Sequence, residues 1–251
     1  MTKVLLTGCN GRMGKVITGL AAEDPDIRIA AGIDIAGDAS GDYPVFRSFE
    51  DVSEEVDVIV DFSSAKAFDS MMDYAVGHQI PVVVCTTGLS EQQIARLDED
   101  SKKVAVLRSA NMSLGVNLLM KLVRQAAATL APAGFDIEIV ERHHNQKKDA
   151  PSGTALALAD SINEEMDHAY TYTFDRSQRS EKRDQKEIGI SAVRGGTIPG
   201  THEVIFAGTD EVIELNHIAY SRSIFGKGAL AAAKFLAGKS AKFYSMSDVI
   251  G

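Results

Sequence analysis

A glycine-rich turn near the start of the chain constrains the fold more than any other sequence feature. It runs from Gly8 to Gly14 with the spacing Gly-x-x-Gly-x-x-Gly, between the apolar run Val4–Leu6 and a helical segment, Lys15–Ala22. Glycines let a backbone approach a ligand closely, and a helix N-terminus presents unpaired N–H groups to a pyrophosphate. Strand, turn and helix in this order therefore predict a dinucleotide site, although a purely structural turn would also use glycines.

Strand and helix signals alternate through the first half of the chain. Apolar strand signals cover 27–33, 56–60, 81–85 and 104–107, and helical character covers 63–78 and the segment that follows a capping box at Ser90 and Gln93. Strands that alternate with helices form parallel sheets with right-handed crossovers. We expect an α/β fold whose N-terminal domain is a Rossmann-like dinucleotide-binding domain.

The pattern changes after Asn111. Helices are expected over 114–130, 152–166 and 224–237, and strands over 135–140, 188–193, 203–207 and 212–220. Consecutive strands favour antiparallel pairing, so this part should be an α+β domain with a mixed or antiparallel sheet. The charge run 176–186 is expected to be an exposed loop. We place the first domain at 1–112 and 224–251, and a domain for substrate binding and oligomerisation at 113–223.

Composition narrows the classes of partner. The 251 residues carry a formal net charge of -9, which disfavours nucleic acid because its phosphates would be repelled. The sequence contains no continuous apolar run of about 18 residues, the length that would predict a membrane span. The two cysteines and the absence of a signal-peptide pattern predict a reduced, cytoplasmic protein.

Three further segments are candidates for cofactor binding. Asp34 ends the second strand about 20 residues past the glycines, where an acidic side chain would accept hydrogen bonds from a ribose, or it could simply begin a turn with Ala36 and Gly37. Thr86-Thr87-Gly88 and Ser109-Ala110-Asn111-Met112 each follow a strand, at the sheet edge where such folds bind ligands. Cys9 and Cys85 are interpreted as small packing residues.

The densest polar cluster is the segment from Glu141 to Thr154. Adjacent histidines on a strand point to opposite faces and no third ligand is suitably spaced, so we expect no metal. His143 and Lys147 could instead donate protons and neutralise an anionic substrate. Ser152 would cap a helix whose first N–H groups suit a carboxylate, whereas the simplest alternative is a solvated basic loop before a capped helix. His202 is interpreted as a strand-edge residue.

The motifs together resemble the 4-hydroxy-tetrahydrodipicolinate reductase family, also called dihydrodipicolinate reductase. The residues that carry the resemblance span nearly the whole chain: Gly8-Cys9-Asn10-Gly11-Arg12-Met13-Gly14, Asp61-Phe62-Ser63, Thr86-Thr87-Gly88, Asn111 to Asn117, Glu141-Arg142-His143-His144, Lys147, and Asp149 to Ala155. Cys85 and Ala65 depart from the family pattern, which often has glycine and proline there.

The resemblance implies reduction of a cyclic unsaturated dicarboxylate to tetrahydrodipicolinate, on the diaminopimelate route to lysine, with NADH or NADPH. It implies that His143 and Lys147 are catalytic and that His144, Gly153 and Thr154 bind the substrate carboxylates. It also implies a homotetramer. The cofactor residues that it implies are Gly8, Cys9, Asn10, Gly11, Arg12, Met13, Asp34, Thr86, Thr87, Gly88, Ser109, Ala110, Asn111 and Met112. Asp34 followed by Ile35 predicts that NADH is preferred, since a 2′-phosphate would be repelled and lacks a paired arginine.

Two other functions stay open at this point. A dehydrogenase of the homoserine or aspartate kind shares the glycine turn and a following mixed domain, but it gives no reason for the His143 to Lys147 segment. A regulatory protein that senses a dinucleotide would bind NADH without oxidising it.

Overall fold

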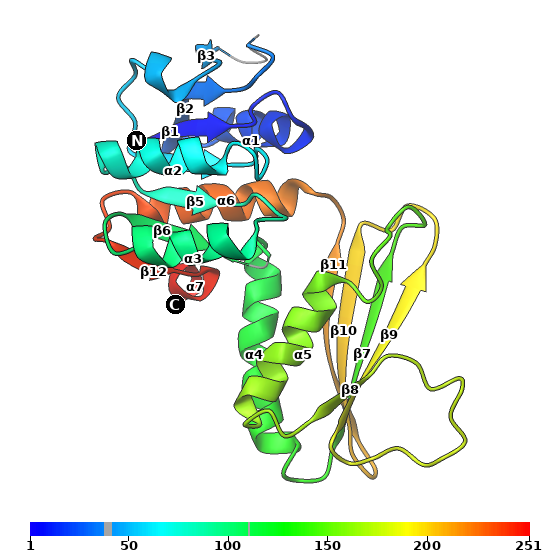
Figure 1. Cartoon of the computed structure of the whole chain (residues 1–251). Coiled ribbons are helices and arrows are strands. Elements are labelled where there is room, and N and C mark those ends of the chain that lie inside the picture. Colours follow the sequence, from blue (N-terminus) through cyan, green and yellow to red (C-terminus); the bar gives the residue numbers. More distant parts are fainter. Residues whose placement is uncertain (38–41, 110) are drawn as a thin grey trace. The chain divides into compact units, whose positions relative to one another are not determined.

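The contacts within the chain divide it into two compact units, Met1–Ser113 with Ser223–Gly251, and Leu114–Arg222. The structure is a computed structural model that describes residues 1–37, 42–109 and 111–251 (Figure 1). The first unit is discontinuous in sequence because the second is inserted into it. Each unit has its own hydrophobic core and is described separately.

The first unit contains a seven-stranded parallel sheet in the order β12-β6-β5-β4-β1-β2-β3. Its strands are β1 (Thr2–Thr7), β2 (Ile27–Ile33), β3 (Val45–Phe46), β4 (Val58–Asp61), β5 (Val82–Val84), β6 (Ala105–Arg108) and β12 (Lys242–Tyr244). Its helices are α1 (Arg12–Ala22), the 3₁₀ turn η1 (Phe49–Asp51), α2 (Phe68–His78), α3 (Glu91–Asp100), α6 (Ser223–Leu236) and α7 (Met246–Ile250).

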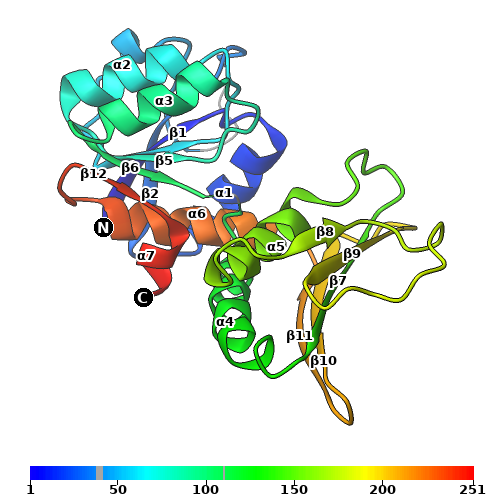
Figure 2. The same cartoon turned by 60° about the horizontal axis from the view of Figure 1, so that its bottom comes forward.

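Helices cover both faces of this sheet (Figure 2). Alternate side chains of a strand point to opposite faces, so Leu5 packs in the core beneath α2 and α3, whereas Val4 and Leu6 pack in the core against α1 and α6. A sheet buried on both sides requires near-continuous apolar strands, which is the pattern that these strands have.

The second unit is a five-stranded sheet covered on one face by two helices (Figure 1). The strand order is β11-β10-β7-β9-β8. The elements are α4 (Leu114–Leu130), β7 (Asp136–His143), α5 (Gly153–Glu165), β8 (Thr171–Thr173), β9 (Glu187–Arg194), β10 (Gly200–Ala207) and β11 (Val212–Ala219). Strand β10 is antiparallel to both of its neighbours, whereas β7, β9 and β8 run parallel. The sheet is therefore mixed, which confirms the predicted α+β domain with a mixed or antiparallel sheet.

Local details differ from the sequence expectations. Strands β9 and β10 follow one another in the chain but do not pair, because β7 lies between them. The helix expected from residue 63 begins at Phe68, since the N–H and hydroxyl of Ser63 bind the Asp61 carboxylate and hold the chain in a loop. The short elements β3, η1, β8, β12 and α7 were not predicted, because two to five residues carry no clear periodicity.

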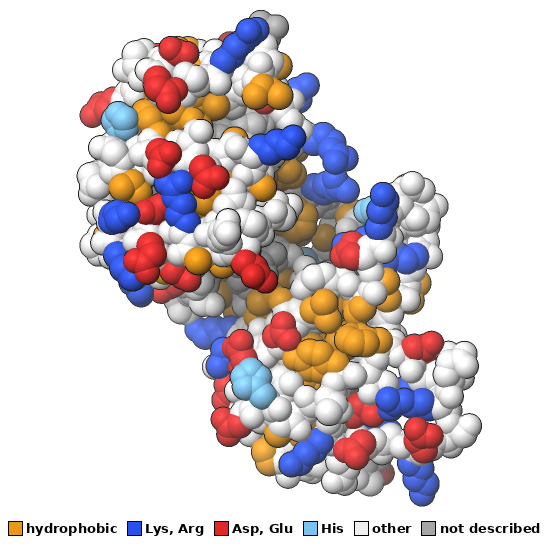
Figure 3. All heavy atoms as spheres, in the orientation of Figure 1, with side chains coloured by type: hydrophobic (Ala, Val, Ile, Leu, Met, Phe, Trp, Pro, Cys, Tyr) orange, Lys and Arg blue, Asp and Glu red, His pale blue; other side chains and the backbone are white. Residues whose placement is uncertain are grey.

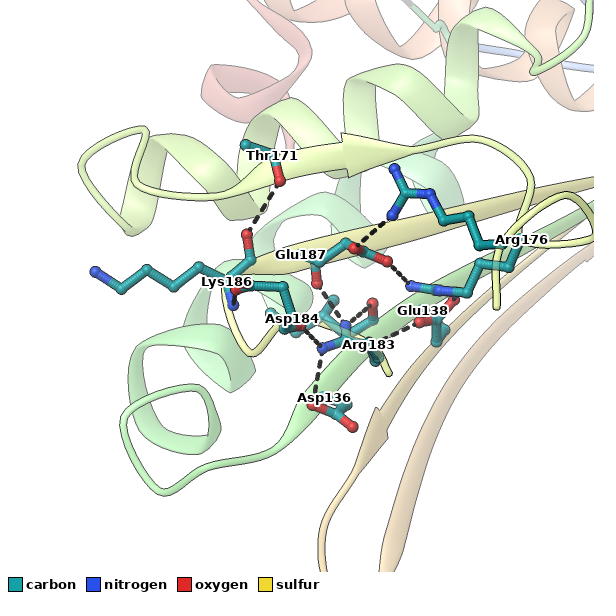
Figure 4. A network of polar contacts seen from close by, with 10 residues as sticks. Asp136, Glu138, Thr171, Arg176, Arg183, Asp184, Lys186 and Glu187 are labelled. Atoms are coloured by element: carbon teal, nitrogen blue, oxygen red, sulfur yellow. Dashed lines mark hydrogen bonds and ion pairs between the residues drawn. The ribbon is translucent and has the colours of Figure 1, made fainter. Parts of the chain in front are cut away.

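The charge run 176–186 is an exposed loop, as expected, but two of its arginines, Arg176 and Arg183, are partly buried and form ion pairs. Arg183 bonds Asp136 at 2.8 Å and Glu138 at 3.0 Å, and it also donates to the backbone oxygens of Ile137 and Glu187 (Figure 4). Arg176 bonds Glu138 at 2.8 Å and pairs with Glu187. The arginines of the loop therefore form ion pairs with carboxylates of β7 and β9, and these ion pairs hold the loop against the sheet.

Surface charge is mixed in sign. Acidic and basic side chains are interspersed over the face drawn in Figure 3, so the net charge of -9 does not make one continuous acidic field there. Among the described residues, no helix has the length and apolar character needed to cross a bilayer.

Candidate functional site

The glycine turn in the first unit is built by backbone contacts that exclude side chains. A Cβ at Gly14 would lie 2.3 Å from the carbonyl oxygen of Cys9, and Gly8 has a φ of +72° beside the backbone of Phe62. Gly11 is the N-cap of α1 and provides no side-chain bond to the first-turn N–H groups. The turn and the start of α1 therefore have the geometry that a pyrophosphate requires.

Asp34 lies at the end of β2 beside this turn. Its carboxylate accepts the N–H of Asn10 at 3.1 Å and that of Ala36 at 3.0 Å. The bonds to Ala36 and Gly37 confirm that Asp34 begins a turn, and its role toward a ribose stays a prediction. Cys9 is buried, and burial, together with the charge of Asp34, raises its pKa to about 11. A neutral thiol suits the packing role.

A pocket with a volume of about 350 Å³ lies at the carboxyl ends of β4, β5 and β6. It is lined by seven residues expected at the cofactor site: Met13, Thr86, Thr87, Gly88, Ser109, Asn111 and Met112. The hydroxyl of Thr86 is buried and has no hydrogen-bond partner among the described residues, which leaves a polar group for a ligand. Ala110 lies outside the described residues.

The same pocket includes residues that sequence reasoning did not select. Phe62 directly follows β4, and Arg108 is the last residue of β6. These positions at strand ends could have indicated both residues as candidates for the site. Phe225 comes from α6, more than a hundred residues later in the chain, and no local signal points to it. Cys85 also lines the pocket, and burial raises its pKa well above the ordinary value, as does the charge of Asp61.

In the second unit, the end of β7 places Glu141 and His143 on one buried face. The strand alternates buried and partly exposed side chains, so Ile137, Ile139, Glu141 and His143 share this face. Nδ1 of His143 lies 2.6 Å from Oε2 of Glu141. Burial lowers the pKa of His143. Glu141 raises this pKa in part, whereas the positive charges of Lys147 and Arg194 lower it further.

Glu141 is fully buried and bound by several donors. Arg194 bonds its two oxygens in a fork, with both distances 2.7 Å, and the N–H of Ser152 donates at 2.9 Å. Burial alone would raise the pKa of Glu141, but the bonds from Arg194, His143 and Ser152 outweigh it and lower that pKa. Sequence reasoning missed Glu141 and Arg194 as site residues, although a carboxylate two residues before His143 on an apolar face was a usable signal.

His202 is a buried residue of β10, which lies between β11 and β7 in the sheet, so its interpretation as a strand-edge residue was wrong. It lies directly across from Glu141 in the sheet, and its ring centroid is 5.1 Å from that of His143. Its Nε2 is 3.0 Å from the Ser152 hydroxyl, which accepts the N–H of Ala155 and caps α5. Burial, with smaller contributions from His143 and other neighbours, lowers the pKa of His202 to about 4.

Lys147 and the start of α5 form the anion-binding part of this cluster. Nζ of Lys147 lies 2.8 Å from the Asp149 carboxylate, and that contact lowers the pKa of Asp149, with a smaller contribution from the Gly153 N–H. A Cβ at Gly153 would meet no atom within 4 Å, so open space lies beside its Cα. Lys147 and the helix N-terminus can therefore bind a carboxylate, and Thr154 follows in the same turn.

His144 lies apart from His143, as expected for neighbours at a strand end. It lines a second pocket, of about 370 Å³, whose other residues include Gln146, Thr197 and Arg222. Within the described part of the chain, no three His, Cys, Asp or Glu side chains are grouped so that they could hold a metal ion.

Known proteins are similar to this chain over nearly its whole length. The family described as "Dihydrodipicolinate reductase, N-terminus" matches residues 2–112, and "Dihydrodipicolinate reductase, C-terminus" matches residues 115–250. A relative from Caldanaerobacter subterraneus, named 4-hydroxy-tetrahydrodipicolinate reductase, is 50% identical and covers 100% of this chain and 98% of its own. One with the same name from Clostridium novyi is 47% identical, with the same coverage.

Solved structures agree on the fold. The dipicolinate-bound dihydrodipicolinate reductase from Paenisporosarcina sp. TG-14 has a TM-score of 0.82 at 24% identity, over 98% of this chain and 97% of that one. A myo-inositol dehydrogenase from Lactobacillus casei, solved with NAD(H), has a TM-score of 0.62 at 14% identity, over 100% of this chain and 91% of that one.

Proposed function

The chain belongs to the dihydrodipicolinate reductase family, and from this premise we propose how its two units divide the work of the reaction. The activity is NAD(P)H-dependent reduction of 4-hydroxy-tetrahydrodipicolinate to tetrahydrodipicolinate in the diaminopimelate route to lysine. In this proposal the first unit binds the dinucleotide, and the second unit binds the dicarboxylate and supplies the proton.

The observation that carries the proposal is the grouping of His143, Lys147 and the N-terminus of α5 within one unit. A buried histidine that bonds a carboxylate lies in the same segment as a lysine and a helix N-terminus that can accept an anion. One part of this group handles a proton and the other neutralises carboxylates, which are the two tasks that reduction of a dicarboxylate ring imposes.

The nicotinamide cofactor, when bound, supplies the hydride. Hydride addition to a conjugated C=C–C=N system adds an electron pair to the ring, and the negative charge that develops must be stabilised and then protonated. In this proposal, Lys147 and protonated His143 do this. The 4-hydroxyl group leaves as water to give the conjugated ring, and one hydride from the cofactor and one proton from the enzyme then complete the reduction. Gly153, Thr154 and His144 hold the two carboxylates.

The residues of the first unit fit a dinucleotide. Gly14 leaves the space that the turn needs, the first turn of α1 has no side-chain cap, and the buried Thr86 hydroxyl lines the pocket. The pyrophosphate would bind at Gly8 to Met13, the ribose at Asp34, and the nicotinamide beside Thr86 to Gly88 and Ser109 to Met112. NADH is the preferred cofactor in this proposal, because Asp34 is followed by the exposed Ile35 instead of an arginine.

A homotetramer in the cytoplasm completes the proposal. Helices α4 and α5 cover one face of the second sheet, and strand alternation places Val193, Val212 and Ile218 on the opposite face, where they are about half exposed. The 176–186 loop binds one part of this face, and the apolar side chains on the rest of it favour burial against another copy. The two free cysteines, Cys9 and Cys85, suit a reducing compartment.

The assay for this function follows NADH absorbance in the presence of substrate made freshly by the preceding synthase. We expect oxidation of NADH that depends on both the enzyme and the dicarboxylate. Binding of NADH without its oxidation would contradict a reductase and support a sensor. Oxidation driven by homoserine or aspartate semialdehyde, but not by this ring, would assign the chain to another substrate.

A further inference from the structure

We propose that Glu141 is a positioning residue for the reaction. It fixes the ring of His143 and holds a hydrogen on Nδ1, so that the other ring nitrogen, Nε2, exchanges a proton with the substrate. This inference rests on the proposed role of His143 in proton donation. Glu141 does not itself need to touch the substrate, because it acts through the histidine.

The carboxylate of Glu141 is held more firmly than a surface carboxylate. Its side chain is 0% exposed, and it lies on the face of β7 that buries Ile137 and Ile139. A charge at such a position is strongly destabilising unless it is paired and hydrogen-bonded. The fork from Arg194 and the N–H of Ser152 provide this compensation. Glu141 therefore remains ionised and immobile.

An ionised carboxylate can only accept a hydrogen bond. Since Nδ1 of His143 lies 2.6 Å from Oε2 of Glu141, Nδ1 must carry the hydrogen. In the neutral ring, Nε2 is then unprotonated and takes up a proton, and in the protonated ring Nε2 releases it. Nε2 lies 3.1 Å from where a Cβ would stand at Gly200, so the glycine leaves this nitrogen free of a neighbouring side chain.

Charged and titratable groups face His143 from each element around it. Glu141 lies on the same strand, Arg194 on β9 directly across from it, His202 on β10, and Lys147 on the following loop. Burial, Lys147 and Arg194 all lower the pKa of His143, whereas Glu141 raises it. Asp149 faces Lys147 and Arg194. Loss of the Glu141 charge should therefore make His143 a poorer base and reduce its protonated fraction near neutral pH.

The test is Glu141→Gln, measured by ¹⁵N NMR of the histidine rings and by steady-state kinetics of the full chain. In the wild type, the neutral His143 ring should show the signature of hydrogen on Nδ1. In Glu141→Gln, the pKa of His143 measured by NMR should fall by about one unit or more. The value of kcat should fall on the order of 10²-fold, and the descending limb of the kcat–pH profile should move to lower pH with it.

A matched control lies on the same strand. Glu138 is also a carboxylate of β7 that is bonded by arginines, Arg176 and Arg183, but it lies in the network of Figure 4 and not beside His143. Glu138→Gln should leave the His143 resonance and the pH profile unchanged. If Glu141→Gln does not fold, Arg194→Gln replaces it, and there the pKa of His143 should rise because a positive neighbour is lost.

Three results would overturn the proposal: hydrogen on Nε2 in the wild type, an unshifted His143 pKa in Glu141→Gln, or a loss of kcat that is equal at every pH. Failure of the proposed function would differ, because full activity in His143→Ala would remove the role of the histidine whatever the NMR of Glu141→Gln shows.

Discussion

At the scale of single residues, the proposed mechanism assigns transition-state stabilisation to Lys147 and substrate binding to His144. Lys147→Ala and His143→Ala should each lower kcat on the order of 10²-fold or more, because each removes charge stabilisation or the proton donor. His144→Ala should instead raise KM for the dicarboxylate, since a group that holds a carboxylate acts on ground state and transition state alike. Kinetics of the three variants, with NADH affinity from calorimetry, check this. Near-normal kcat in Lys147→Ala, or lost NADH affinity, would contradict the assignment.

Asp34 is the residue on which cofactor choice depends in this proposal. Its carboxylate accepts the Asn10 N–H at the glycine turn, where it would repel a 2′-phosphate. We expect kcat/KM with NADH to equal or exceed that with NADPH, and Asp34→Asn to raise the relative use of NADPH. A clear preference of the wild type for NADPH would mean that another cation, such as Arg12 or Lys15, neutralises the phosphate.

At the scale of a secondary-structure element, α1 contains a matched pair of glycines. A Cβ at Gly14 would lie 2.3 Å from the Cys9 carbonyl oxygen, whereas a Cβ at Gly19 would meet nothing within 4 Å. Gly14→Ala should distort the turn and abolish NADH binding. Gly19→Ala should retain binding and raise the free energy of unfolding by up to about 1 kcal/mol, because alanine favours helix. Calorimetric titration and urea denaturation measure the two effects.

At the scale of the whole molecule, assembly should depend on the uncovered face of the second sheet. Sedimentation equilibrium at micromolar concentration should give a tetramer. Ile218→Asp, on β11, should dissociate it because a charge would be buried at the interface. Ile35→Asp, a substitution at an isoleucine that is 92% exposed in the first unit, should leave the tetramer intact. A wild-type chain that sediments only as a monomer would contradict the proposal.

Stability of the whole chain should depend on pH through His202. Its pKa in the folded state is about 4, below the ordinary 6.5, so the unfolded state binds more protons between these values. The free energy of unfolding should therefore fall as the pH is lowered from 6.5 to 4, on top of the slope from other groups. His202→Gln should flatten that part of the slope in a series of thermal melts.

The sequence by itself determined the local and periodic features. The glycine turn, the alternating apolar strands, the capping box at Ser90 and the face shared by Ile137 and Ile139 depend on contacts within a few residues, which a linear pattern records. The class of fold follows from them, because a parallel sheet and a mixed sheet require different patterns of burial. The family resemblance depends on motif residues, above all the segment from Glu141 to Ala155.

Only the tertiary structure decided how distant segments meet. It placed β7 between β9 and β10 and brought Phe225 to the pocket at the carboxyl ends of β4, β5 and β6. It also bonded Arg194 to Glu141 and placed His202 beside Ser152 and His143. It also paired the charges of Arg176 and Arg183 with β7 and β9. Long-range pairing has no period in sequence, since each partner is chosen by geometry and charge in the folded state. For that reason a pattern in the sequence could indicate His143 and Glu141, which share a strand, but not Arg194 and His202, which come from other strands.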